Sequence, residues 1–182
     1  MAKTYTVQAL GVRRQDDACL AQVVRQAPEG ATQTFLAGWP LKAAAGLLLE
    51  WVTVADELLA GFAMEDATGT TSKLIDFVPA LPHSDLEVEG NILVTATNAT
   101  YNLLAADLFV NRTLEKGANL LGTSLPGWFI GNTATAAALQ TCAFESNQAV
   151  PTDASSIPGV GDTDARIRAK LLTSACYFGA VS

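Results

Sequence analysis

The chain has 182 residues, of which 49% are hydrophobic and only 16% are charged, and its formal net charge is −7. This acidic balance argues against direct binding of DNA or RNA, which depends on basic patches that neutralise phosphates. No apolar run approaches the ~20 residues that span a bilayer, and the first residues lack the apolar stretch of a secretory signal peptide. We therefore expect a protein that is made and kept in a cytosol and that contacts neither nucleic acid nor a membrane.

The first residues alternate between apolar and polar side chains, with Tyr5, Val7 and Ala9 on one face. Successive side chains of a strand leave opposite faces, so this period of two predicts a strand over Thr4–Leu10. Residues 1–30 otherwise differ in pattern from the rest of the chain, and we expect them to form an N-terminal arm or extension.

Two short segments have the apolar spacing of a helix. Apolar residues recur at i, i+3, i+4 and i+7 in both segments, which predicts a short helix at each place. The first segment carries Leu20, Val23, Val24 and Ala27, and the second carries Tyr101, Leu104, Ala105 and Leu108. The second segment could equally form a pair of strands.

Seven further strands are expected because alternating or apolar runs are separated by turn residues at short intervals. These strands are Trp39–Ala44, Leu47–Val54, Leu58–Ala63, Lys73–Pro79, Leu86–Thr95, Gly127–Ile130 and Ala165–Ser174. Short strands broken by regular turns predict an all-β fold, a small β-barrel or a β-tulip or sandwich. Residues 31–182 are expected to form this single β-barrel domain.

Long surface loops are the other expected feature of the fold. The segment Pro151–Asp164 is rich in proline, serine, glycine and aspartate, which is typical of a loop on the surface.

The sequence offers little of the chemistry that enzymes and metal sites need. His83 is the only histidine, and no G-x-S-x-G motif occurs. The three cysteines, Cys19, Cys142 and Cys176, are widely spaced, so we expect buried free thiols rather than a disulfide framework or a zinc site. We expect no catalytic residues, no metal and no cofactor.

The three tryptophans, Trp39, Trp51 and Trp128, allow two interpretations. They could line a platform on which sugars stack, or they could be buried in a core or an interface. Each lies in an apolar or strand-like run, so burial is the stronger interpretation.

The centre of the chain resembles a family of known proteins. Three segments occur in order, Leu59–Ala67 with the letters LAGFAMEDA, Val78–Pro82 with VPALP, and Leu86–Asn91 with LEVEGN. This order of strands and turns resembles the head decoration, or cement, proteins of tailed-phage virions. The resemblance covers roughly residues 35–175 and involves no catalytic residue. In physical terms, Gly61 would allow a close backbone approach or a bulge, and Pro79 would end a strand.

The resemblance implies a structural virion protein that binds the outside of a phage capsid and stabilises it by clamping neighbouring capsid subunits. The implied partners are the major capsid protein and further copies of the chain, commonly in a trimer. The implied location is the outer surface of the capsid, after synthesis in the host cytoplasm.

Two alternatives to this function stay open. The chain could be another structural component of the virion, such as a tail part or the base of a head fibre, or it could be a carbohydrate-binding β-module. For the decoration protein, we expect the N-terminal strand with Tyr5, Val7 and Ala9 to contact the capsid or a neighbouring protomer by strand addition.

Overall fold

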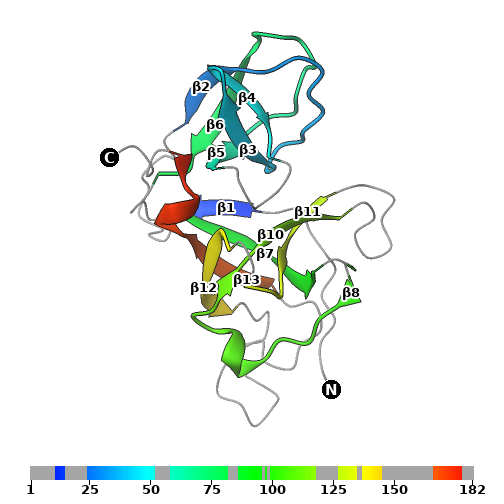
Figure 1. Cartoon of the computed structure of the whole chain (residues 1–182), viewed down its shortest axis with the longest axis vertical. Coiled ribbons are helices and arrows are strands. Elements are labelled where there is room, and N and C mark those ends of the chain that lie inside the picture. Colours follow the sequence, from blue (N-terminus) through cyan, green and yellow to red (C-terminus); the bar gives the residue numbers. More distant parts are fainter. Residues whose placement is uncertain are drawn as a thin grey trace. The chain divides into compact units, whose positions relative to one another are not determined.

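The computed structural model of the chain describes residues 11–14, 24–51, 58–81, 86–95, 97, 99–117, 127–134, 137–144 and 166–177. These residues form strands and two 3-10 turns, and no α-helix occurs among them (Figure 1). The expected all-β fold is therefore confirmed. The chain divides into two compact units, Met1–Gly11 with Val88–Lys170 and Val12–Glu87 with Leu171–Ser182.

An antiparallel sheet of five strands is the framework of the unit that contains residues 12–87. Its strands lie in the order β2-β6-β5-β3-β4. They are β2 (Arg25–Pro28), β3 (Pro40–Ala44), β4 (Leu47–Glu50), β5 (Leu59–Ala63) and β6 (Leu74–Pro79). The turn between β3 and β4 has two residues, Ala45 and Gly46, both with positive φ. Such turns match the twist of the strands that they connect.

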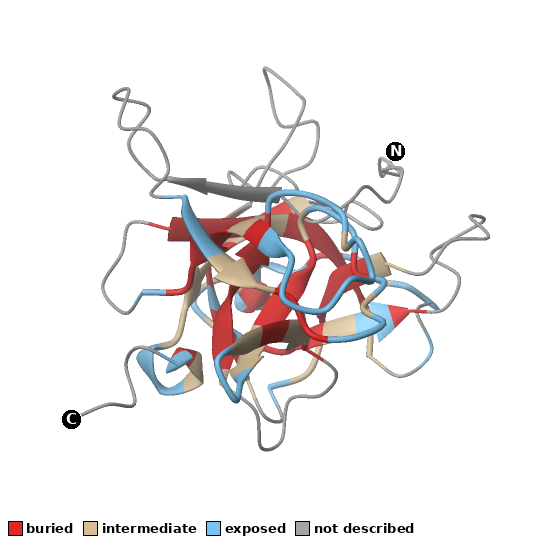
Figure 2. Ribbon diagram, turned by 90° about the horizontal axis from the view of Figure 1, so that it is seen from above, coloured by how far each residue is buried: buried red, intermediate tan, exposed pale blue. Residues whose placement is uncertain are grey.

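The two ends of this sheet meet. Glu29, which directly follows β2, forms a parallel bridge with Leu48 of β4. The N–H of Gly30 donates to the Leu48 carbonyl at 2.8 Å. These contacts bring the first strand of the sheet to the last, so the five strands curl into a small barrel. Large side chains from the barrel and its connections are fully buried, among them Phe35, Leu41, Trp51, Leu59, Phe62 and Ile75. Figure 2 colours the buried residues red, and they make up much of the strands.

Gly61 lies in the middle of β5, where two backbones approach closely. It pairs with Leu41 on one side and with Pro79 on the other. A Cβ on Gly61 would lie 2.2 Å from the carbonyl oxygen of Val78, a distance that real Cβ atoms do not show. The register between β3 and β5 also shifts beside Leu41. Both expectations for Gly61, a close approach and a bulge nearby, are confirmed, as is the strand end at Pro79.

The larger sheet has eight strands, six of them in the order β10-β11-β7-β13-β12-β9. These six are β7 (Leu86–Val94), β9 (Asn111–Arg112), β10 (Leu114–Gly117), β11 (Gly127–Gly131), β12 (Leu139–Phe144) and β13 (Arg166–Leu171), and the other two are β1 (Gly11–Arg14) and β8 (Ala99–Thr100). The β11–β7 pair is parallel, whereas β10 with β11 and β12 with β9 are antiparallel.

Arg166 of β13 joins two neighbouring strands of this sheet that are far apart in the sequence. Its Nε donates to the Glu89 carboxylate of β7 at 2.9 Å, and both side chains are largely buried. One terminal nitrogen of Arg166 also donates to the Asn91 side chain at 3.4 Å. The predicted strand Ala165–Ser174 and the predicted strand Leu86–Thr95, which carries the LEVEGN segment, are therefore neighbours in the sheet.

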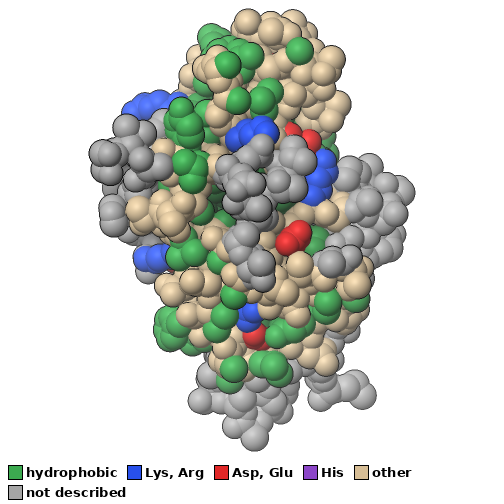
Figure 3. Space-filling model, viewed as in Figure 1, with side chains coloured by type: hydrophobic (Ala, Val, Ile, Leu, Met, Phe, Trp, Pro, Cys, Tyr) green, Lys and Arg blue, Asp and Glu red, His purple; other side chains and the backbone are tan. Residues whose placement is uncertain are grey.

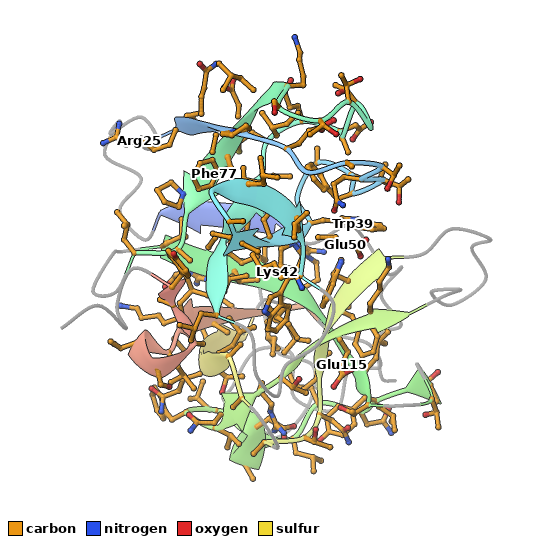
Figure 4. All side chains as sticks on the ribbon, turned by 45° about the horizontal axis from the view of Figure 1, so that its top comes forward. Arg25, Trp39, Lys42, Glu50, Phe77 and Glu115 are labelled. Carbon is orange, nitrogen blue, oxygen red and sulfur yellow. The ribbon has the colours of Figure 1, made fainter. Side chains whose placement is uncertain are left out.

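The first expected helix is wrong where the structure describes it. Ala27 lies in β2, which pairs residue by residue with β6, so that Arg25 faces Phe77 across the strands (Figure 4). Pairing with an existing strand outweighs the weak helical spacing of so short a segment. Leu20 and Val23 lie outside the described residues.

The second expected helix is also wrong. The structure has only the 3-10 turn η1 (Ala105–Asp107), with β8 before it and β9 after it. The Asp107 carboxylate accepts a hydrogen bond from the Leu104 N–H at 2.7 Å, which closes a tight turn instead of a helix. The alternative interpretation, a pair of strands, is not found in this segment either, because β8 and β9 flank it and pair with β7 and β12.

The remaining expectations concern the arm and the loops. The predicted boundary at residue 30 falls inside the unit of residues 12–87, because Arg25–Pro28 pair with Leu74–Phe77. The predicted strand Thr4–Leu10 and the predicted loop Pro151–Asp164 lie outside the described residues.

Candidate functional site

The predicted contact residues Tyr5, Val7 and Ala9 lie outside the described residues. Their role in binding a capsid or a protomer stays a prediction. His83 and Cys19 also lie outside that part of the chain.

All three tryptophans are buried. Trp51 and Trp128 lie within the cores of their units, and Trp39 precedes β3 (Figure 4). Burial, the stronger of the two interpretations from sequence, is confirmed. A platform for stacking sugars needs an exposed aromatic face, and none of the three tryptophans presents one in this structure.

The described cysteines are free thiols. Cys176 is buried, and burial raises its pKa to about 11, so the thiol stays protonated at neutral pH. Cys142 is half-buried. Across the part of the chain that the structure describes, no three His, Cys, Asp or Glu side chains are placed to hold a metal ion. In the same part, no helix is long and apolar enough to cross a membrane.

Among the residues that the structure describes, the most exposed large apolar residue belongs to a short segment between β8 and β9. Phe109 is 69% exposed and Leu104 is 53% exposed, on either side of the η1 turn. Ala105 and Ala106 are exposed between them. We call Leu104–Val110 the apolar turn. Asp107 is its one ionisable residue, and this carboxylate is buried.

Asp107 holds the apolar turn from the inside. Its carboxylate accepts hydrogen bonds from the Tyr101 hydroxyl at 3.0 Å and from the Leu104 N–H at 2.7 Å. It also forms a buried ion pair with Arg112 of β9, whose guanidinium in turn donates to the Asn132 carbonyl. Burial, together with the neighbouring Asp107 carboxylate, raises the pKa of Tyr101, which keeps the phenol protonated as a donor.

Thr141 of β12 holds the other end of the turn. Its carbonyl accepts from the Phe109 N–H at 3.0 Å, and its N–H donates to the Val110 carbonyl at 3.0 Å. Its hydroxyl accepts from the Val110 N–H at 3.0 Å and donates to the Asp107 carbonyl. The turn is thus fixed by backbone bonds and by a buried ion pair.

Phe109 adopts a backbone conformation that a bulky side chain rarely takes. Its φ is +61°, in the left-handed region that favours glycine. Such strain costs about 1–3 kcal/mol and persists only where the surroundings over-determine it, and it clusters at functional sites. The bonds to Thr141 and Asp107 supply that constraint, so Phe109 is held out of the core at a conformational cost.

A second rigid feature lies in the other unit, around the buried side chain of Glu29. The carboxylate accepts from the Thr68 hydroxyl at 2.6 Å, the Thr68 N–H at 2.9 Å and the Thr70 N–H at 2.6 Å. Burial alone would raise the pKa of Glu29, but these hydrogen bonds outweigh it and lower the pKa below its usual value. The polar connection between β5 and β6 is thereby tied to the barrel seam.

Charged groups are sparse on the one face of the molecule that Figure 3 shows, as far as its residues are described. On the face of the molecule that Figure 3 shows, apolar and uncharged polar atoms cover most of the described surface. This agrees with the low charged fraction of the sequence. The described surface is better suited to contact with another protein than to recognition of a highly charged ligand.

Sequence reasoning missed both features. The apolar residues of the apolar turn have the spacing of a helix, and the sequence therefore predicted a helix there. An apolar run interrupted by a single aspartate was the signal that could have indicated the turn. Glu29 gave no signal, because it sits between Pro28 and Gly30 in what looks like a solvated turn.

Comparison of the chain with protein-family models, with curated proteins and with solved structures finds no match.

Proposed function

We propose that the chain is a structural protein of a tailed-phage virion, which binds the outside of the capsid and stabilises it by clamping neighbouring capsid subunits. Its partners under this proposal are the major capsid protein and two further copies of itself. The proposal assigns no reaction and no cofactor to the chain.

The observation that carries the proposal is the placement of the three segments that resemble decoration proteins. The LAGFAMEDA segment begins with β5, the VPALP segment begins in the last residues of β6, and the LEVEGN segment begins β7. Three successive strands thus coincide with the segments on which the resemblance rests.

The surface gives independent support. A decoration protein must cover part of its own exterior with its partners, and apolar side chains without charge favour such contacts. Leu104 and Phe109 in one unit and Met64 in the other are exposed apolar side chains of this kind. Many identical sites on one shell supply avidity, so each contact can be weak.

Trimerisation is part of the proposal, because closed symmetry covers apolar surface without open-ended polymerisation. Light scattering on the purified protein is expected to give three times the mass of one chain, or one chain mass if the trimer forms only on the capsid. A monomer in solution together with isolated single copies on the shell would contradict trimerisation in both forms.

The function is tested with capsids of the phage that encodes the chain, prepared without this protein. The purified protein is expected to sediment with them and to add density to the outer surface in electron microscopy. Density confined to the tail would instead favour another structural component of the virion, and no association with the particle would contradict a virion role.

A further inference from the structure

We propose that the apolar turn, Leu104–Val110, is an attachment point at which Phe109 inserts into an uncharged apolar socket of the capsid protein. This inference rests on the proposed function and deepens it, because it names the side chain that makes the contact. It follows from the exposure, charge, strain and anchoring of the turn.

Charge determines the chemistry of the socket. The carboxylate of Asp107 is buried and neutralised by Arg112, so the turn presents no exposed ionised group of its own. A charged or strongly polar site on the partner would lose its hydration without gaining a bond. The matching surface is therefore apolar.

Area decides which kind of partner fits. Phe109 and Leu104 together expose on the order of 200 Å², taking roughly 200 Å² for one fully exposed aromatic side chain. A stable protein dimer buries about 800 Å² on each partner. The turn alone is too small to form a stable complex with any single protein, a second copy of the chain included, but it suits one contact that is repeated many times on one shell.

The strain at Phe109 supports a role in binding rather than in folding. Phe109 is 69% exposed as a residue, so burial of its side chain does not offset the unfavourable φ of +61° in the free protein. The anchors at Asp107 and Thr141 hold the backbone in one conformation, so little conformational entropy is lost when the ring is bound. Exposed, rigid aromatic side chains are typical of the residues that dominate interface energies.

A membrane is the less favoured occupant. Peripheral membrane binding combines apolar insertion with basic residues that attract anionic lipids. The turn has no basic residue, since Arg112 is buried in the ion pair, and the chain carries a net charge of −7.

The experiment measures sedimentation of full-length protein with capsids that lack it, comparing the natural chain with the Phe109→Gly variant. Glycine adopts the positive φ without strain, so the variant is expected to melt at the same temperature or higher. Its affinity for the capsid is expected to fall at least about 30-fold, the effect of truncating a dominant interface residue. The pairing of unchanged stability with weaker binding separates a contact role from a structural role.

A matched pair of variants provides the control. Leu104→Ser changes the turn, and Leu74→Ser changes a leucine of nearly equal exposure on β6, 53% and 52% respectively. Leu104→Ser is expected to weaken capsid binding, and Leu74→Ser is expected to leave it within about threefold, an energy difference below 1 kcal/mol. Equal effects of the two would contradict a specific role for the turn.

The other outcomes are distinguishable. If the natural chain binds capsids and Phe109→Gly binds equally well, the inference is wrong and the proposed function stands. If the natural chain does not bind capsids, the proposed function fails and the inference falls with it. Binding to neutral phosphatidylcholine vesicles that Phe109→Gly abolishes, or a change in oligomeric mass in that variant, would assign the turn to a membrane or to a second copy and overturn the inference.

Discussion

Thr68 donates two hydrogen bonds to Glu29, one from its hydroxyl at 2.6 Å and one from its N–H at 2.9 Å, across a sequence separation of 39 residues. The same carboxylate also accepts the Thr70 N–H. Glu29 itself sits where the five-stranded barrel closes on Leu48. One buried carboxylate therefore joins the closure of the barrel to the connection between β5 and β6.

Replacing Glu29 with glutamine is expected to destabilise the protein. The amide keeps the size of the side chain but presents an N–H₂ group to donors that need an acceptor, and a hydrogen bond to a charged group contributes about 1.5–3 kcal/mol. Urea denaturation should show a free energy of unfolding lower by about that amount. Glu65→Gln is the control, because Glu65 accepts a single exposed N–H from Asp76. Equal losses for the two variants would contradict the role given to Glu29.

The contribution of Glu29 is expected to depend on pH. Its pKa is lower in the folded chain than in the unfolded chain, so the folded state binds fewer protons. The stabilisation is full above the unfolded pKa of about 4.3 and is lost as pH falls through the folded pKa. The difference in melting temperature between the natural chain and Glu29→Gln should be constant from about pH 7 to 6 and should shrink below about pH 4. If the difference in melting temperature between the two chains grew as the pH fell, the pKa of Glu29 would be raised on folding and not lowered.

A methyl group at Gly61 is expected to disrupt the barrel. The new Cβ would lie 2.2 Å from the Val78 carbonyl oxygen and 2.8 Å from Phe77 Cδ2, and the backbone oxygen cannot move without breaking the sheet. Gly61→Ala should cost about 3 kcal/mol, the upper end for overpacking. Gly46→Ala introduces only the strain of a positive φ in open space and should cost about 1 kcal/mol. Thermal melts of both variants provide the comparison, and a smaller loss for Gly61→Ala would be incompatible with this packing.

The ion pair under the apolar turn is expected to show strong coupling. Asp107→Ala leaves the buried Arg112 guanidinium without its carboxylate, which costs about 3–5 kcal/mol. Arg112→Met in the same chain removes the uncompensated charge, so the double variant should be more stable than Asp107→Ala alone. A double-mutant cycle by chemical denaturation measures this coupling. Strictly additive effects would show that the two groups do not stabilise each other.

The N-terminal segment is expected to contribute to capsid binding without contributing to the isolated fold. Under the proposed function, Tyr5, Val7 and Ala9 add a strand to the capsid or to a neighbouring protomer. Deleting residues 2–10 should then weaken sedimentation with capsids while the melting temperature stays within a few degrees. If the shortened chain decorates capsids as well as the full chain does, the segment has no such role.

Strands with clear alternation or compact apolar runs could be predicted from the sequence, because local pattern and final burial agree there. β7 is an example on its apolar face, where Leu86, Val88 and Ile92 are buried, although Glu87 and Asn91 on the opposite face are buried as well. β2 and β10 could not be predicted. β2 forms because it pairs with β6, whose residues lie 46 or more positions away in the sequence, as in the pair Pro28–Leu74. β10 has one apolar core residue, Leu114, so its sequence shows no alternation of apolar and polar residues.

The candidate site was harder to predict from the sequence than the fold was. The exposure of Phe109 depends on Thr141, and the burial of Asp107 depends on Arg112 and Tyr101, so neither can be inferred from local hydropathy. Buried polar residues are satisfied by partners that only the tertiary structure supplies. A sequence pattern shows where an aspartate occurs but not whether a guanidinium will meet it.

The bridge between Leu59 and Cys176 has a consequence for how the chain is made. A ribosome releases the N-terminal end first, so the five strands between Arg25 and Pro79 are available to pair before the strands from β7 onward have been translated. Cys176 follows all described strands of the other unit in the sequence. A nascent chain can therefore build the barrel early, but Leu59 gains Cys176 as a neighbour only after those strands have been synthesised.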